Sequence, residues 1–280
     1  MKKIIISSVI GGLVLCSSTV LAQSKVEKTK IDNKSLNNMV INAAIGNKTT
    51  ANVGAVNIQN SKVKKSKISN KSLNSQAINA SIGHKSIANT GSVNIKDSKV
   101  SKAKIDNKSL NVGVVNAAIG SKTIANVGSV NVSQSKINST KISNKSLNTG
   151  VVNAAIGSKA IANTGSVNIS QSKLSGAKIS NKSLNAGVVN AAIGLNTTAN
   201  VGSINMSKAT ANSAKITNKS INAGVVNAAV GIGATANVGS VNVSNNDVSG
   251  LTVNNSSLNA LTVNVAVGAG SSDTGSVNIE

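Results

Sequence analysis

The stretch Ile31-Asp32-Asn33-Lys34-Ser35-Leu36-Asn37 decides the fold, because the chain repeats it at a constant spacing. It returns every 37 residues, and the chain of 280 residues holds seven copies, which start near 31, 68, 105, 142, 179, 216 and 253. A period of this length is typical of solenoids and arrays, in which each repeat packs only on its neighbours. The sequence therefore predicts one repeat domain over residues 31–280, with a short lead-in at 23–30 that is already in phase.

Short runs within each copy alternate apolar and polar side chains with a period of two. In Val152-Asn153-Ala154-Ala155-Ile156 the first, third and fifth positions are apolar, and Gly157 follows. Such alternation favours half-buried strands over helices. The chain has no proline and no aromatic residue, so small and β-branched side chains must form thin layers. We therefore predict an all-β fold, a β-solenoid with no helical domain beyond the N-terminal signal and with glycine and asparagine at its corners.

Equivalent positions in the seven copies form columns, which indicates that the copies stack in register. The absence of a clean half-repeat favours one folded layer per repeat, with lysine columns on the outside. One column contains only isoleucine and valine, and we expect it to point into the core: Ile45, Ile82, Ile119, Ile156, Ile193, Val230 and Val267.

Asparagine occupies several columns in all seven copies. Stacked side-chain amides can hydrogen-bond from layer to layer, as in cross-β ladders, or each asparagine can serve only its own turn. The sequence leaves both roles open. The two columns singled out as structural are Asn33, Asn70, Asn107, Asn144, Asn181, Asn218, Asn255 and Asn42, Asn79, Asn116, Asn153, Asn190, Asn227, Asn264.

The formal net charge is +22, and every basic residue is lysine. The lack of arginine and aromatic side chains disfavours a sequence-specific nucleic-acid reader, although nonspecific attraction to anionic polymers remains open. The charge is uneven, since the last lysine is Lys219 and the acidic Asp247, Asp273 and Glu280 follow it. The candidate polyanion contacts are Lys34, Lys71, Lys108, Lys145, Lys182 and Lys219.

The N-terminus has the pattern of a secretory signal peptide over residues 1–22. Lys2 and Lys3 precede an apolar segment at 4–15, and Val20 and Ala22 fit the −3 and −1 positions of a cleavage site. The only cysteine, Cys16, lies inside this segment, so the mature chain would have no disulfide. We expect a protein secreted to the extracellular space or cell surface of a bacterium, most consistent with a Gram-negative one.

Residues for catalysis are not apparent in the repeats. His84 is the single histidine, and the seven acidic residues form no recurring pair suited to acid–base work. Asp32 and Asp106 share a column that otherwise holds mostly Ser or Thr, and we interpret them as offsetting nearby lysines. We predict no catalytic residues, no cofactor, no metal site and no small-molecule substrate, and hence a protein that is not an enzyme.

The phrase N-A-A-I-G…A-N-V-G-S-V-N, carried by tandem repeats rich in Gly, Asn, Ala and Val behind an export signal, resembles the secreted functional amyloid subunits of bacterial biofilms. The closer resemblance is to Fap-type fibre subunits, with curli-type repeat proteins more distant. It covers residues 31–279 and implies export through a dedicated outer-membrane pore and self-assembly into surface fibres. We therefore expect a fibre-forming subunit that associates head to tail through its ends. The alternative is a monomeric adhesin that binds anionic polysaccharide or DNA through its lysine columns.

Overall fold

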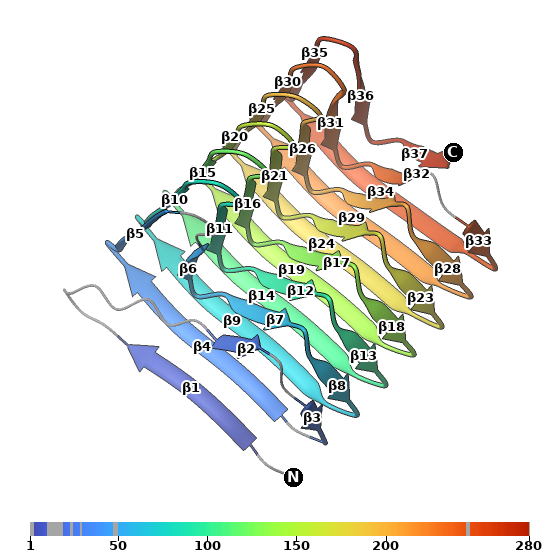
Figure 1. The fold of residues 1–280 in the computed structure, drawn as a ribbon. Helices are drawn as coiled ribbons and strands as arrows, with labels where there is room; N and C mark the ends of the chain where they lie inside the picture. The colour runs from blue at the N-terminus through green and yellow to red at the C-terminus, as the bar shows by residue number, and fades with distance from the viewer. Residues whose placement is uncertain are drawn as a thin grey trace.

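The computed structural model describes residues 3–9, 19–22, 25–28, 30–46, 50–244 and 247–279. The chain winds as a parallel β-solenoid (Figure 1), and none of these described residues lies in a helix. The fold predicted from the sequence is confirmed. Cys16 in the predicted signal peptide and Gln23 at the predicted cleavage site both lie outside the described residues. The signal peptide therefore stays a prediction.

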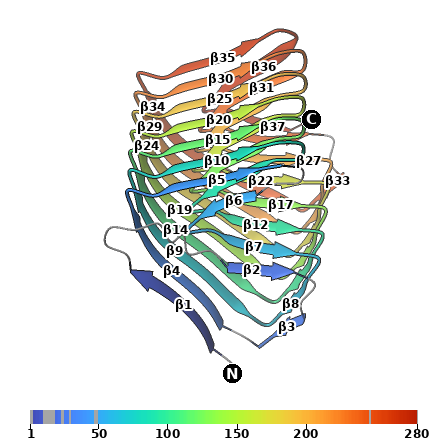
Figure 2. The same cartoon turned by 60° about the vertical axis from the view of Figure 1, so that its left-hand side comes forward.

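Each coil contributes strands to five parallel sheets that run along the solenoid, here called sheets A to E in the order of the coil (Figure 2). Sheet A holds the long strands β1 (Lys3–Val9), β4 (Lys30–Asn38), β9 (Lys67–Ser75), β14 (Lys104–Val112), β19 (Lys141–Thr149), β24 (Lys178–Ala186), β29 (Lys215–Ala223) and β34 (Thr252–Ala260). Sheet B holds β5 (Ile41–Ile45), β10 (Ile78–Ile82), β15 (Val115–Ile119), β20 (Val152–Ile156), β25 (Val189–Ile193), β30 (Val226–Val230) and β35 (Val263–Val267). Sheet C holds β6 (Thr50–Val53), β11 (Ile87–Thr90), β16 (Ile124–Val127), β21 (Ile161–Thr164), β26 (Thr198–Val201), β31 (Ala234–Val238) and β36 (Gly270–Thr274).

Sheets D and E close each coil. Sheet D holds β2 (Thr19–Ala22), β7 (Val56–Gln59), β12 (Val93–Lys96), β17 (Val130–Ser133), β22 (Val167–Ser170), β27 (Ile204–Ser207), β32 (Val241–Ser244) and β37 (Val277–Ile279). Sheet E holds β3 (Lys25–Glu27), β8 (Lys62–Lys64), β13 (Lys99–Ser101), β18 (Lys136–Asn138), β23 (Lys173–Ser175), β28 (Thr210–Asn212) and β33 (Asp247–Ser249).

One repeat makes one layer, as the sequence predicts. Asn107 of β14 pairs with Asn70 on one side and Asn144 on the other, so each residue lies beside its own equivalent 37 positions away. Neighbouring strands in a sheet are about 4.8 Å apart. Every sequence column is therefore a physical row of side chains along the solenoid.

The corners of the coil lie in the left-handed region of backbone space, where glycine is favoured. Gly113 has a φ of 59° between sheets A and B, but its equivalent in the preceding coil is Gln76, with a φ of 49°. Lys65 and Lys102 also have positive φ, between sheets E and A. Glycine marks only part of these corners, and exposed residues of several types, such as Met39, Ser139 and Leu261, occupy others.

The main core is formed by sheets A, D and E. Four columns meet there, buried except in the last coil, and Ile105, Val130, Val132 and Ile137 represent them in one layer. A narrower second core lies between sheets B and C, where Ala118 and Ala125 represent the buried alanine columns. Alanine and asparagine side chains fill this second gap, and its narrowness limits the size of the side chains that sheet B can point inward.

The core column predicted on sheet B is wrong. In β20 the inward side chains are Asn153 and Ala155, whereas Val152 and Ile156 are 43% and 39% exposed. The asparagine amide is satisfied inside by hydrogen bonds, and the alanine fits the narrow gap, so the larger side chains face outward. The corrected column, in which Val230 is half-buried and the others are exposed, is Ile45, Ile82, Ile119, Ile156, Ile193, Val230 and Val267.

Candidate functional site

The asparagine columns form continuous ladders of side-chain amides inside the solenoid. In the first column, Asn33 Nδ2 donates to Asn70 Oδ1 at 2.7 Å, and each later amide donates onward until Asn218 Nδ2 reaches Asn255 Oδ1 at 3.0 Å. Asn70 is fully buried. A parallel ladder runs from Asn37 to Asn259. The ladder role that the sequence left open is confirmed for the Asn33 column.

The Asn42 column also links two sheets. Asn153 Nδ2 donates to Asn190 Oδ1 at 2.8 Å in the next layer and lies 3.1 Å from the carbonyl of Ala125 and 3.2 Å from that of Asn163. These carbonyls belong to sheet C. The column therefore acts as a ladder and as a bridge across the narrow core, which explains why a polar side chain replaces an aliphatic one there.

The ladders have a direction. Amides in the Asn33, Asn37 and Asn42 columns donate toward the C-terminal end. The Asn57 column donates the opposite way, since Asn94 Nδ2 donates to Asn57 Oδ1 at 2.9 Å and Asn278 Nδ2 donates to Asn242 Oδ1 at 2.9 Å. The two ends of the solenoid are consequently chemically different.

Three buried amide atoms at the N-terminal end have no hydrogen-bond partner among the described residues: Asn33 Oδ1, Asn37 Oδ1 and Asn57 Nδ2. Strand β1 lies against β4 with Ile6 opposite Asn33, and β2 lies against β7 with Val20 opposite Asn57. Isoleucine and valine have no amide group, so the residue types at these two register positions do not continue the ladders. A buried polar atom left without a partner costs about 1–3 kcal/mol, so this end lacks the neighbour that its chemistry requires.

The C-terminal end presents the matching groups. Asn255 and Asn259 end two of the three ladders that donate toward this end, and Asn278 ends a ladder that donates away from it. Asn255 Nδ2 also donates to the carbonyls of Gly275 and Ser276 in its own coil. Asn259 Nδ2 has only a long contact of 3.4 Å to Ser257 Oγ in its own strand. Inward positions of β34 are half-buried, whereas their equivalents in β29 are buried. The last coil of the described chain thus ends with an open layer.

A groove of about 1300 Å³ runs along the outer face of sheet A. Lysines form one wall, the backbone of a serine column forms the floor, and leucine or isoleucine forms the other wall. In one layer these residues are Lys108, Ser109 and Leu110. The candidate polyanion contacts predicted from the sequence all line it, and all are exposed: Lys34, Lys71, Lys108, Lys145, Lys182 and Lys219.

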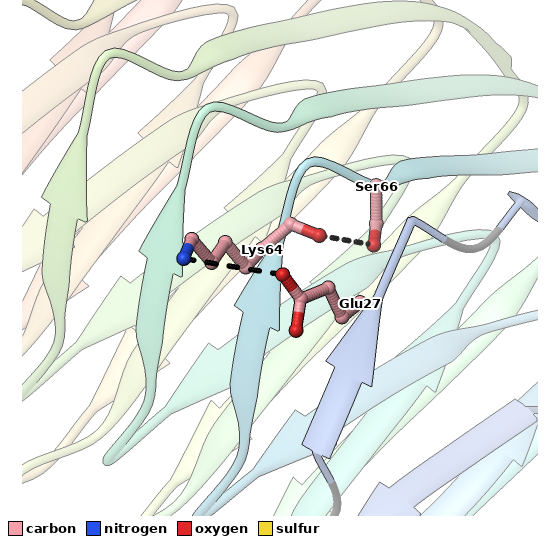
Figure 3. A network of polar contacts seen from close by, with 3 residues as sticks. All are labelled: Glu27, Lys64 and Ser66. Carbon is pink, nitrogen blue, oxygen red and sulfur yellow. Dashed lines mark hydrogen bonds and ion pairs between the residues drawn. The ribbon is translucent and has the colours of Figure 1, made fainter.

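Ion pairs occur beside the groove rather than in it. Lys30 pairs with Asp32 at 2.9 Å, and Lys104 pairs with Asp106 at 3.2 Å, as expected for acids that offset local lysines. Near the N-terminal end, Glu27 of β3 lies 3.9 Å from Lys64 of β8, whose carbonyl accepts a hydrogen bond from Ser66 (Figure 3). Within the described residues, no groove lysine takes part in a salt bridge.

In the described part of the chain, no group of three or more His, Cys, Asp or Glu side chains could hold a metal. His84 is exposed. Among the same residues, no helix is long and apolar enough to cross a membrane.

The leucine wall of the groove and two of the three unpartnered amides, those of Asn37 and Asn57, were not chosen as site residues from the sequence. A signal for the leucine existed, because Leu36 follows Lys34 by two positions and side chains two apart share a strand face. The serine column between them gives no such signal, because strand alternation points it inward.

The fold and its ladders define a parallel β-solenoid with asparagine-lined ends and a basic groove. No family model, no curated protein and no solved structure matches the chain.

Proposed function

We propose that this chain is a structural subunit of extracellular fibres, which grow by head-to-tail stacking of solenoid ends. The single observation that carries the proposal is the set of three unpartnered amide atoms, Asn33 Oδ1, Asn37 Oδ1 and Asn57 Nδ2. A second copy stacked in register would bring Asn255 Nδ2 to the first, Asn259 Nδ2 to the second and Asn278 Oδ1 to the third. All three ladders would then run unbroken from one copy into the next.

Only the head-to-tail arrangement matches donors with acceptors. Two N-terminal ends placed together would oppose oxygen to oxygen in the Asn33 and Asn37 columns, and two C-terminal ends would oppose donor to donor. Backbone pairing across the five sheets would provide most of the binding, as it does when an extended strand adds to an open sheet edge. The amides would fix the register and the polarity.

Removal of the predicted signal peptide would open the N-terminal end of the solenoid for stacking. Strands β1 and β2 lie within residues 1–22, on the layer that carries the orphan atoms, while β3 begins after the predicted cut. Cleavage before Gln23 would take away β1 and β2 and leave β4 and β7 open. Assembly would then follow export and would be blocked before it.

The outer face of sheet B gives stacked copies a second contact. Its outward side chains are aliphatic along the whole solenoid, with Val152 and Ile156 as the pair in one layer. Exposed apolar faces of this kind mark association surfaces. The patch runs along all seven coils of one chain, and stacking would extend it from copy to copy, so lateral pairing should accompany elongation.

The test uses one substitution on each face of β34. Asn259→Asp keeps an oxygen that accepts from Asn222 but cannot donate to the next copy and sets a carboxylate against Asn37 Oδ1. Ala260→Asp adds the same charge on the outward, exposed face of the same strand, in the column of the uncharged Asn38, and serves as control. Fibre growth of the chain from Gln23 onward is followed by light scattering and electron microscopy.

We expect Asn259→Asp to slow elongation at neutral pH by roughly fivefold or more, given about 1–3 kcal/mol per unpaired buried group, and Ala260→Asp to grow like the parent. A protonated carboxyl can donate, so growth of Asn259→Asp should recover as the pH falls below about 4, the ordinary pKa range of aspartate. Equal slowing by both variants, or no fibres from the parent, would overturn the proposal.

A further inference from the structure

The groove on sheet A differs chemically from the rest of the lysine-coated surface. Its two walls are unlike, with ammonium groups on one side and aliphatic groups on the other, as Lys145 and Leu147 show in one layer. Leu147 is 38% exposed, although it lies beside a charged column. Maintaining an apolar row next to a cationic row suits a ligand with a charged edge and an apolar edge.

The groove lysines repel one another when nothing is bound. They lie in adjacent layers about 4.8 Å apart, and two exposed unit charges at such a distance repel by about 1 kcal/mol before salt screening. The neighbouring lysine column is partly neutralised, because Lys30 and Lys104 face Asp32 and Asp106. The groove lysines lack a salt-bridge partner among the described residues, so a row of anions would relieve the repulsion.

The spacing of the lysines selects the class of ligand. An extended peptide advances about 3.3 Å per residue and turns alternate side chains away, so its same-face charges are nearly 7 Å apart. Phosphates along one strand of duplex DNA are 3.4 Å apart along the axis. A linear polyuronate carries one carboxylate on each sugar, so a chain that lies along the groove with its carboxylates turned to one side would meet one lysine in each coil.

The chemistry of the two groove walls favours the same class of ligand, a linear polyuronate. A pyranose ring has an apolar C–H face that can lie on the leucine row while its carboxylate points to the lysine row. Nucleic-acid binding would call for arginine forks or aromatic stacking platforms, and the chain contains neither arginine nor aromatic residues. We infer that the groove binds a linear polyuronate, one sugar per coil, with lysine contacting the carboxylates and leucine contacting the sugar rings. This inference concerns one chain and does not depend on fibre growth.

The test measures binding of a galacturonate hexamer to the full chain by titration calorimetry. The groove variant is Lys108→Ser with Lys145→Ser, since Ser256 already occupies this column in the last coil. The matched control is Lys99→Ser with Lys136→Ser, which removes the same charge from the exposed lysine column of sheet E. A third variant, Leu110→Ser with Leu147→Ser, changes the apolar wall without changing the charge.

We expect the groove variant to weaken binding roughly threefold to tenfold, as two exposed ion pairs allow, and the control to change it less than twofold. The leucine variant should also weaken binding, and its circular dichroism should match the parent. Equal losses in the groove and control variants would show general charge attraction and would overturn the site. Equal or tighter binding of a thymidine hexanucleotide or of hexaglutamate would overturn the polyuronate assignment.

Discussion

Asn153 and Ile156 lie three residues apart on β20 and point to opposite faces of sheet B. Asn153 is fully buried, and its amide makes contacts in the next layer and in sheet C, whereas Ile156 is 39% exposed. The polar residue is thus the structural one, and the aliphatic residue is at the surface. Substitution of the polar Asn153 should therefore destabilise the solenoid more than substitution of the aliphatic Ile156, although aliphatic residues are usually the ones that stabilise a core.

We predict that Ile156→Lys folds with little loss, because an exposed substitution away from special features changes stability by less than about 1 kcal/mol. Asn153→Leu should cost at least about 2 kcal/mol, because Asn116 Nδ2 loses an acceptor and Asn190 Oδ1 loses a donor. Denaturant unfolding of the two variants measures the difference. A larger loss for Ile156→Lys would mean that sheet B faces the other way.

The glycine column at the end of sheet C allows close packing against sheet A. A Cβ at Gly128 would lie 2.8 Å from Ser109 Oγ and 3.0 Å from Asn111 Nδ2, with φ at +60°. Gly113 has φ at +59°, yet the nearest atom to a Cβ there is 3.8 Å away. The two glycines share the same backbone conformation, but only Gly113 has room for a Cβ atom.

Alanine at these two positions separates backbone strain from crowding. Both Gly113→Ala and Gly128→Ala should lose about 1 kcal/mol from the left-handed conformation. Gly128→Ala should lose a further 1–3 kcal/mol, roughly, from overpacking. Thermal and denaturant unfolding provide the comparison, and indistinguishable variants would contradict the close approach of sheets A and C.

Charge should orient the assembly. Asp247 shares its column with Lys25, because β33 and β3 hold equivalent positions at the two ends of sheet E. Head-to-tail stacking would bring the acidic last repeat to the basic first one. Asp247→Lys with Asp273→Lys should therefore slow fibre growth at low salt, and the difference should shrink as salt screens it.

The control for that swap is Asp97→Lys with Asp106→Lys, the same charge change in the middle of the solenoid. At low salt we expect this control to grow at a rate closer to that of the parent than the end variant does. Identical growth rates for the end variant and the parent at low salt would show that charge does not orient the assembly. Only the open strand edges and the amide ladders would then direct the stacking.

Much of the fold could be predicted from the sequence, because the period places equivalent residues side by side. Seven copies of Asn33 and its neighbours indicated stacking in register, one layer per repeat and lysines outside. The inward face of β20 could not be predicted, since Val152, Ala154 and Ile156 alternate as a buried strand would. The narrow gap opposite Ala125 decides which face of β20 points inward, and this gap exists only when sheets B and C are packed together.

The candidate site was predictable in part for a similar reason. The lysine row and the asparagine columns follow from the period alone. The direction of each ladder, and hence the orphan atoms of Asn33 and Asn57, depends on how the amides are oriented between layers. No sequence pattern carries that orientation.

The central claim, in-register head-to-tail stacking, is tested most directly by electron cryomicroscopy of fibres grown from the chain that begins at Gln23. The account predicts polar filaments in which layers about 4.8 Å apart repeat as one subunit every seven layers, or about 34 Å, with Asn259 of one copy against Asn37 of the next. Filaments with two-fold axes across their subunit contacts, or subunits joined only through sheet B, would contradict it.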